Sequence, residues 1–312
     1  MKRTFVVALL LALCTPVVAS AATACSEFTS PGGMHAELCD PGADVAVVMV
    51  PGATYNSAYW DFPYQPEVYS FRRELNARGY ATATVDRIGT GRSAKPPSLT
   101  VTALRQAAAV DEVVQSVRAR GFGKVVLAGH SLGSMITIMS AATFHHVDGV
   151  VVTGATHAID PPALATLLGS RLEPRSLLDA GYLTTRQGER YNAFHAPGNV
   201  DPQVLATDEA TKDVASLGEM PDGLSLGIVL PYSALIDVPV LLAVGERDTL
   251  FCTALSRDCS SAQTLVAGER GYYAGSPDVR GFVLPGAGHD ANLHPRAKEL
   301  QTAVADWIRD VV

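Results

Sequence analysis

A single serine stands where a buried strand is expected to turn sharply into a helix. Residues 124–142 read KVVLAGHSLGSMITIMSAA, with aliphatic residues before Ser131 and an apolar, helix-compatible run after it. Gly129 and Gly133 lie two positions to either side, where a side chain in a tight turn would collide with the strand or the helix. The pattern predicts a nucleophilic serine, although so short a motif also occurs by chance in purely structural turns.

Strands and helices alternate along most of the chain, as is needed to hold such a turn. The expected strands are residues 34–38 (an edge strand), 45–50, 80–85, 125–127, 147–153, 238–244 and 281–284. The expected helices are residues 67–78, 100–120, 132–142, 260–269 and 295–311. Alternation of this kind demands parallel pairing with crossover connections, so we expect an α/β fold with a mostly parallel central sheet flanked by helices.

The alternation fails in residues 160–236. This segment is rich in proline, has scattered helical stretches at 163–168 and 202–217, and contains no apolar strand. Long stretches of this kind inside compact domains are usually functional lids or insertions. The segment also carries several leucines and aromatic residues, which could line a pocket for a hydrophobic group or pack on the core.

Bulk composition favours an exported globular protein. Hydrophobic residues make up 47% and charged residues 18% of the chain, which argues against disorder, and the net charge of −7 without basic runs argues against binding to nucleic acid or an anionic membrane. The first residues have a basic start, an apolar run too short to span a bilayer, and small residues, as in a secretory signal peptide. We expect residues 1–24 to be this signal, with cleavage after Ala21 or Ala24.

Export makes the protein secreted or periplasmic. Cleavage after Ala24 would place Cys25 at the new N-terminus, which raises a lipoprotein as an alternative, although Ala22 is unusual for that signal.

The cysteines fit an oxidising compartment. Removal of the signal leaves Cys25, Cys39, Cys252 and Cys259, an even number that permits three pairings. We favour the two local disulfides, Cys25–Cys39 and Cys252–Cys259, because each closes a short loop rich in turn residues. Neither these cysteines nor any histidine pair has the spacing of a metal site, so we expect no metal.

The ordered motifs resemble those of the α/β-hydrolase superfamily, in its serine esterase and lipase-like branch. Gly52 ends an early strand where the family places its oxyanion loop, and residues 86–93 fit its D-x-x-G-x-G-x-S loop. Residues 129–133 match the nucleophile elbow, while residues 245–248 (GERD) and 286–289 (GAGH) follow the last two strands. Each motif is weak alone, but together they stand at strand ends in the family's order of serine, acid and histidine.

The resemblance implies a Ser-His-Asp triad. A serine hydroxyl is a weak nucleophile until a base takes its proton, and we assign His289 as the base of Ser131. Asp248 would fix the tautomer of His289 and stabilise its imidazolium. His294 is the competing base and Glu246 the competing acid.

By the family's pattern, the oxyanion is held by the backbone N–H groups of Leu132 and Ala53. Many relatives have His-Gly where this chain has Pro51-Gly52, a difference that keeps the backbone donor but removes a side chain that often orders the loop.

Four residues are candidate substrate contacts. Tyr55 and Asn56 follow the oxyanion loop, with a purely loop-forming role as the alternative. His130 precedes the nucleophile, where packing is the alternative, and His157 follows a strand and could instead lie on the surface.

Taken with the family, the segments divide into a hydrolase core, residues 25–159 and 237–312, and a mainly helical cap, residues 160–236, inserted after the sixth strand. We expect hydrolysis of a carboxylic ester of a small, hydrophobic substrate through an acyl-enzyme, without a cofactor and without stable membrane insertion. The alternatives are a lactonase, an amidase or peptidase, a lyase or cyclase using the same triad, and a non-catalytic binding protein on this fold. No sequence feature indicates an oligomeric state.

Overall fold

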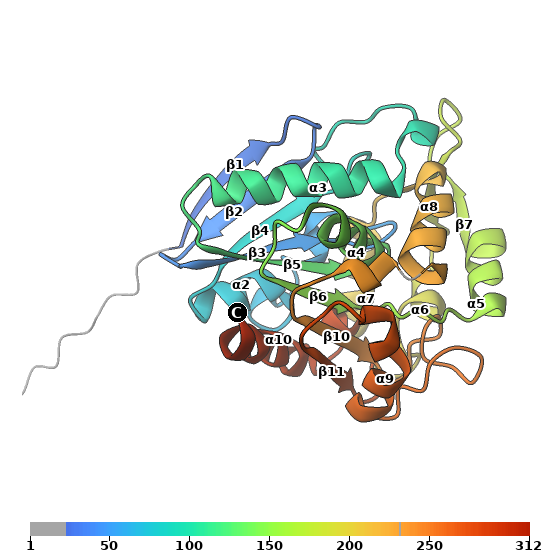
Figure 1. The fold of residues 1–312 in the computed structure, drawn as a ribbon. Coiled ribbons are helices and arrows are strands. Elements are labelled where there is room, and N and C mark those ends of the chain that lie inside the picture. The colour runs from blue at the N-terminus through green and yellow to red at the C-terminus, as the bar shows by residue number, and fades with distance from the viewer. Residues whose placement is uncertain (1–22, 231) are drawn as a thin grey trace, which may run out of the picture.

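The computed structural model describes residues 23–230 and 232–312 (Figure 1). The predicted signal peptide falls almost entirely on residues 1–22 and so lies outside the described residues. No helix among the described residues is both long and apolar enough to cross a membrane.

A twisted eight-stranded sheet forms the centre of the molecule. Its order is β1-β2-β4-β3-β5-β6-β10-β11; β1 pairs with β2 and β2 with β4 antiparallel, and every later pairing is parallel. The strands are β1 (Ala24–Thr29), β2 (His35–Asp40), β3 (Val45–Val50), β4 (Ala81–Asp86), β5 (Lys124–His130), β6 (Gly149–Thr153), β10 (Val240–Gly245) and β11 (Val279–Leu284). The predicted mostly parallel sheet is confirmed. Strand β1 was not predicted, because its mainly exposed residues carry no apolar pattern.

Helices cover both faces of this sheet, as predicted. Figure 1 shows α3 and α4 on one face and α2 and α10 on the other. Helix α4 is buried along most of its length because the sheet, α3 and the 160–236 segment enclose it. The helices of the core are α1 (Pro66–Tyr69), α2 (Phe71–Ala77), α3 (Ala103–Arg118), α4 (Leu132–Phe144), α9 (Ala262–Glu269) and α10 (Ala297–Val311).

The segment of residues 160–236, the cap, follows β6 and precedes β10. Its helical elements are α5 (Pro161–Thr166), η3 (Leu167–Arg171), α6 (Arg190–Ala193), α7 (Pro202–Thr211), η4 (Leu217–Glu219), α8 (Met220–Leu224), η5 (Ser225–Val229) and η6 (Tyr232–Leu235). It also holds a small antiparallel sheet of β7 (Leu172–Pro174), β8 (Tyr182–Thr185) and β9 (Ala215–Ser216).

That small sheet was not predicted within the mainly helical cap. Its strands have two to four residues, too few to produce a readable alternation of apolar and polar side chains. The helix expected over residues 202–217 ends at Thr211, because Lys212 leaves the helical region with ψ 149° and residues 215–216 pair with β8.

Two disulfides join the cysteine pairs favoured by the sequence. Cys25–Cys39 connects β1 to β2, and Cys252–Cys259 closes the loop after β10. The lipoprotein alternative needs a free Cys25 sulfur to carry the lipid, and that sulfur is bonded to Cys39. The structure therefore argues against this alternative.

Candidate active site

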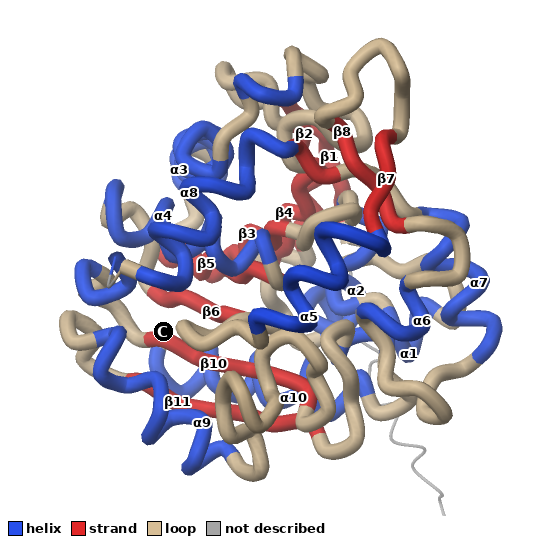
Figure 2. Tube along the Cα trace, turned by 90° about the vertical axis from the view of Figure 1, so that its right-hand side faces the viewer, coloured by secondary structure: helices blue, strands red, loops and turns tan. Residues whose placement is uncertain are grey.

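The motif residues converge at one edge of the sheet. Ser131 follows β5, Asp248 follows β10, and His289 follows β11, and the carboxyl ends of these parallel strands all point the same way. The cap lies over this edge: it occupies the right-hand side of Figure 1, and Figure 2 looks directly onto it.

The serine turn is strained and tightly packed. Ser131 has φ 54° and ψ −122°, a conformation that is costly for a residue with a side chain. A Cβ on Gly129 would lie 2.4 Å from the Gly133 carbonyl oxygen, and one on Gly133 would lie 2.3 Å from the Val50 oxygen. Both glycines are therefore required for the chain to turn here and present the serine hydroxyl at the start of α4.

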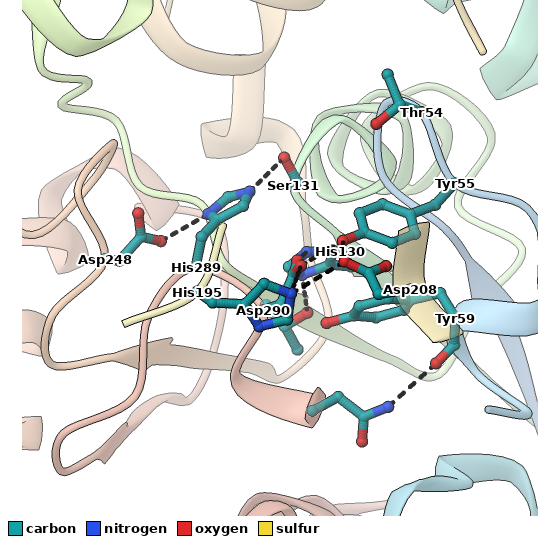
Figure 3. Close-up of polar contacts among 12 residues, drawn as sticks. Thr54, Tyr55, Tyr59, His130, Ser131, His195, Asp208, Asp248, His289 and Asp290 are labelled. Carbon is teal, nitrogen blue, oxygen red and sulfur yellow. Dashed lines mark hydrogen bonds and ion pairs between the residues drawn. The ribbon is translucent and has the colours of Figure 1, made fainter. Parts of the chain in front are cut away.

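His289 lies between the serine and the aspartate (Figure 3). Its Nε2 is 2.8 Å from Ser131 Oγ, and its Nδ1 is 2.8 Å from Asp248 Oδ2. The other carboxylate oxygen of Asp248 accepts the N–H groups of Leu250, at 2.8 Å, and Phe251, at 3.2 Å. The imidazole and carboxylate are buried, whereas Ser131 is partly exposed.

Electrostatics favour the protonated form of this histidine. Burial alone would lower the pKa of His289, but the adjacent Asp248 carboxylate outweighs burial and raises the pKa above its ordinary value. The arrangement suits an imidazole that accepts a proton from the serine and holds it as an ion pair with the aspartate.

The competing acid and base are engaged elsewhere. Glu246 is exposed, and its carboxylate accepts the Gly286 N–H at 2.8 Å. His294 Nε2 lies 2.7 Å from the Asn199 amide nitrogen. The fold therefore places Ser131, His289 and Asp248 in contact, as expected. Glu246 and His294 contact other residues instead.

Both expected oxyanion donors lie beside the nucleophile. Leu132 is the first residue of α4, so its N–H has no acceptor within the helix. The Ala53 loop passes against the serine, since a Cβ on Gly52 would be 3.0 Å from Ser131 Cβ. Ala53 and Leu132 line the same cavity as the serine.

That cavity lies between the core and the cap, and residues of both line it. The empty space between the two is about 700 Å³ when the part open to solvent is included. Ser131 and His289 form its reactive wall, and Thr54 and Tyr55 add the other polar groups. The remaining lining residues are apolar: Ala53, Leu132, Met135, Ile159, Leu164, Leu167, Leu168, Leu172, Phe194, Ala215, Met220, Leu224, Leu250 and Phe251.

Of the four candidate substrate contacts, Tyr55 lines this cavity. Asn56, His130 and His157 are not among the described residues that line it. The Asn56 amide instead donates to Asp213 at 3.0 Å and caps the following turn through the Ala58 N–H. It organises the loop, which is the role named as its alternative.

The two histidines pack away from the cavity. His130 Nε2 is 3.0 Å from Asp290 Oδ1 and its ring stacks on Tyr59, and burial lowers its pKa. His157 Nδ1 is 2.7 Å from Glu269, and the ring is buried rather than on the surface. Both rings are buried and contact a carboxylate rather than the cavity.

A second set of buried polar residues lies next to the triad, and the sequence did not indicate it. We call Tyr55, Arg190, His195, Asp208 and Asp290 the buried network. Asp208 and Arg190 form an ion pair with side chains 0% exposed, and Asp290 directly follows His289. In sequence, an aspartate after His289 and an arginine in a proline-rich segment are both typical of solvated side chains, so no signal marked them.

Two groups of donors in this region are close enough together to be considered as metal sites. One comprises His195, Asp208 and Asp290, and the other comprises His130, His289 and Asp290. The Arg190 guanidinium donates to both oxygens of Asp208, at 2.8 and 2.9 Å. In the first group the Asp208 carboxylate is therefore already paired with a guanidinium, and His289 of the second group is engaged by Ser131 and Asp248.

Comparison with known proteins gives one family and many similar folds. The family model described as "Alpha/beta hydrolase family" matches residues 47–298. A thermophilic esterase from Thermogutta terrifontis superposes with a TM-score of 0.60 at 18% identity, covering 92% of this chain and 98% of the other. The carboxylesterase CesB from Bacillus subtilis superposes with a TM-score of 0.63 at 17% identity, covering 93% of each chain. The comparison with curated proteins found no match.

Proposed function

The chain belongs to the alpha/beta hydrolase family, and on that premise we propose that it cleaves carboxylic esters through a covalent acyl-enzyme on Ser131. The observation that carries this proposal is the hydrogen-bonded series Ser131–His289–Asp248 at the wall of an apolar cavity. The esterases with similar folds are consistent with it.

Acylation begins at the serine. Ser131 Oγ attacks the ester carbonyl while His289 Nε2 takes its proton, and the Asp248 carboxylate stabilises the resulting imidazolium. The carbonyl oxygen becomes an oxyanion, which the Ala53 and Leu132 N–H groups stabilise. The imidazolium then protonates the departing alcohol, and the acyl group remains on Ser131.

Deacylation repeats the sequence with water. His289 takes a proton from a water molecule that attacks the acyl carbonyl, the same two amides stabilise the second oxyanion, and Ser131 leaves with the proton from the imidazolium. The carboxylic acid is released, and the free triad is restored.

The cavity favours an uncharged, hydrophobic substrate. Almost all of its lining is aliphatic or aromatic, and a charged acyl chain there would lose its hydration without gaining a partner. We also propose that the protein acts outside the cytoplasm, because its two disulfides persist in oxidising compartments.

The proposal is tested with the purified mature protein, a fluorophosphonate probe and p-nitrophenyl esters of increasing chain length. We expect stoichiometric labelling and ester hydrolysis, both lost in Ser131→Ala. A folded wild-type protein that neither labels nor hydrolyses would indicate a binding protein instead. Matched lactones and amides in the same assay identify the preferred bond.

A further inference from the structure

Thr54 has an unusual backbone conformation next to a proposed oxyanion donor. Its φ is 62°, in the left-handed region, which a β-branched residue rarely adopts. Its neighbour Ala53 carries the amide that would face the oxyanion. A strained residue of this kind persists only where its surroundings hold it firmly, so the contacts of Thr54 are the place to look for what fixes this loop.

The cap supplies those contacts. Arg190 Nη1 of α6 donates to Thr54 Oγ1 at 3.1 Å, and the guanidinium lies over the Tyr55 ring, 4.1 Å from its centroid. The Asp213 N–H, also from the cap, donates to the Thr54 carbonyl at 2.9 Å. The cap thus contacts the loop at the Thr54 side chain, the Thr54 carbonyl and the Tyr55 ring.

Arg190 is itself fixed inside the cap. Its Nε and Nη2 donate to the two oxygens of Asp208 in α7, and His195 Nε2 is 2.9 Å from the same carboxylate. Burial would favour the neutral acid, but the guanidinium keeps the pKa of Asp208 well below its usual range. A bidentate pair sets the plane of the guanidinium and therefore the direction of its bond to Thr54.

Tyr55 extends this network to the other two active-site loops (Figure 3). Its hydroxyl donates to Asp290, which adjoins His289, and lies 3.4 Å from Asp208. The other oxygen of Asp290 contacts His130, which adjoins Ser131. The oxyanion loop, the base and the nucleophile are therefore linked through buried polar contacts.

We propose that Arg190, held by Asp208, is a positioning residue: it fixes the Thr54–Tyr55 turn and thereby aims the Ala53 N–H at the oxyanion. Support for this turn comes from the cap, through Arg190 and the Asp213 N–H. The inference rests on the proposed function, because an oxyanion arises only if Ser131 attacks a carbonyl.

A second buried ion pair provides a matched control. Arg87, which follows β4, pairs with Glu219 of the cap, and both side chains are 0% exposed. Among the described residues, the hydrogen-bond partners of the Arg87 guanidinium are Glu219 and the Val214 carbonyl, which lie outside the oxyanion loop. Losing either arginine leaves one buried carboxylate uncompensated, but only Arg190 contacts Thr54.

The test compares Arg190→Gln with Arg87→Gln. Active sites are titrated with a fluorophosphonate, so that rates refer to folded, reactive protein. Butylboronic acid is the second probe, because its boron forms a tetrahedral adduct with Ser131 Oγ that resembles the tetrahedral intermediate. For Arg190→Gln we expect kcat per site to fall about 10- to 100-fold, part of the loss caused by removing an oxyanion donor, with KM within about threefold. Affinity for the boronic acid should fall by a similar factor. Arg87→Gln should lower Tm and keep kcat per site within about twofold.

Thr54→Val and Thr54→Ser decide the question if Arg190→Gln does not fold. Valine removes the acceptor of the Arg190 bond at constant shape and leaves the Arg190–Asp208 pair intact, whereas serine keeps the hydroxyl. We expect kcat per site to be at least about fivefold lower in Thr54→Val than in Thr54→Ser, because a misplaced donor loses much of its effect.

Two results would overturn the inference: equal kcat per site in Thr54→Val and Thr54→Ser, or an equal loss in Arg87→Gln and Arg190→Gln. Failure of the wild type to react with the fluorophosphonate would instead refute the proposed function.

Discussion

The two walls of the cavity differ in origin and in chemistry. The core wall presents Ser131 and His289 from the ends of sheet strands, with Asp248 buried behind them. The cap wall presents mostly aliphatic side chains from short helices and turns, such as Leu167 of η3. We therefore propose that bond cleavage belongs to the residues at the strand ends, whereas the cap selects the substrate and, through Arg190, supports the oxyanion loop.

Removing the nucleophile should have the largest effect. Ser131→Ala is expected to lower kcat for ester hydrolysis by about 10⁶-fold, because the cap wall holds substrate but offers no replacement for the serine. Hydrolysis of p-nitrophenyl butyrate and a thermal melt measure activity and folding together. Retention of more than a few per cent of the activity by a folded variant would place the nucleophile elsewhere.

Changing the buried acid comes next. Asp248→Asn should lower kcat by about 10⁴-fold, because an amide stabilises neither the required tautomer nor the imidazolium of His289. The matched control is Glu246→Gln, which alters the exposed acid two residues away and should leave kcat nearly unchanged. The reverse pattern would make Glu246 the acid of the triad.

A cap substitution should alter selection without altering chemistry. Leu167→Ala removes apolar contact area from the cavity and should lower kcat/KM about tenfold for octanoate esters, through KM, with little change for acetate esters. Leu177→Ala, at a side chain 98% exposed, is the control. Equal effects on short and long esters would contradict the division between the two walls.

The pH profile should show the smallest change. His289 must be neutral to act as a base, and its pKa is raised, so kcat/KM should decline as pH falls through a midpoint above about 6.5, the ordinary imidazole value. In Asp248→Asn the raising charge is lost while burial remains, so the midpoint should move downward. If the midpoint does not move in Asp248→Asn, the ionisation seen in the pH profile belongs to a group other than His289.

The core wall could be predicted from the sequence because its signals are local. Gly129 and Gly133 mark the turn around Ser131, and Asp248 and His289 each lie in the loop after an apolar strand. Parallel pairing brings strand ends together, so their order along the chain was enough to expect a common site.

The cap wall could not be predicted, because its signals are not local. Arg190 and Asp208 are ordinary charged residues in sequence, and their burial depends on a bidentate pairing that no spacing rule reveals. The strands β7 and β9 exist because β8 pairs with them, rather than through their own alternation. Likewise, Asn56 and His157 follow strands that lead to the cavity, yet neighbouring carboxylates hold both side chains elsewhere.

The central claim is that Ser131 carries the acyl group during turnover. Acid quenching of the reaction with p-nitrophenyl butyrate, followed by peptide mass mapping, tests it directly. The account predicts a butyryl adduct on Ser131, accumulating in Asp248→Asn if that substitution slows deacylation more than acylation. An ester that turns over with the butyryl adduct on a residue other than Ser131 would contradict it.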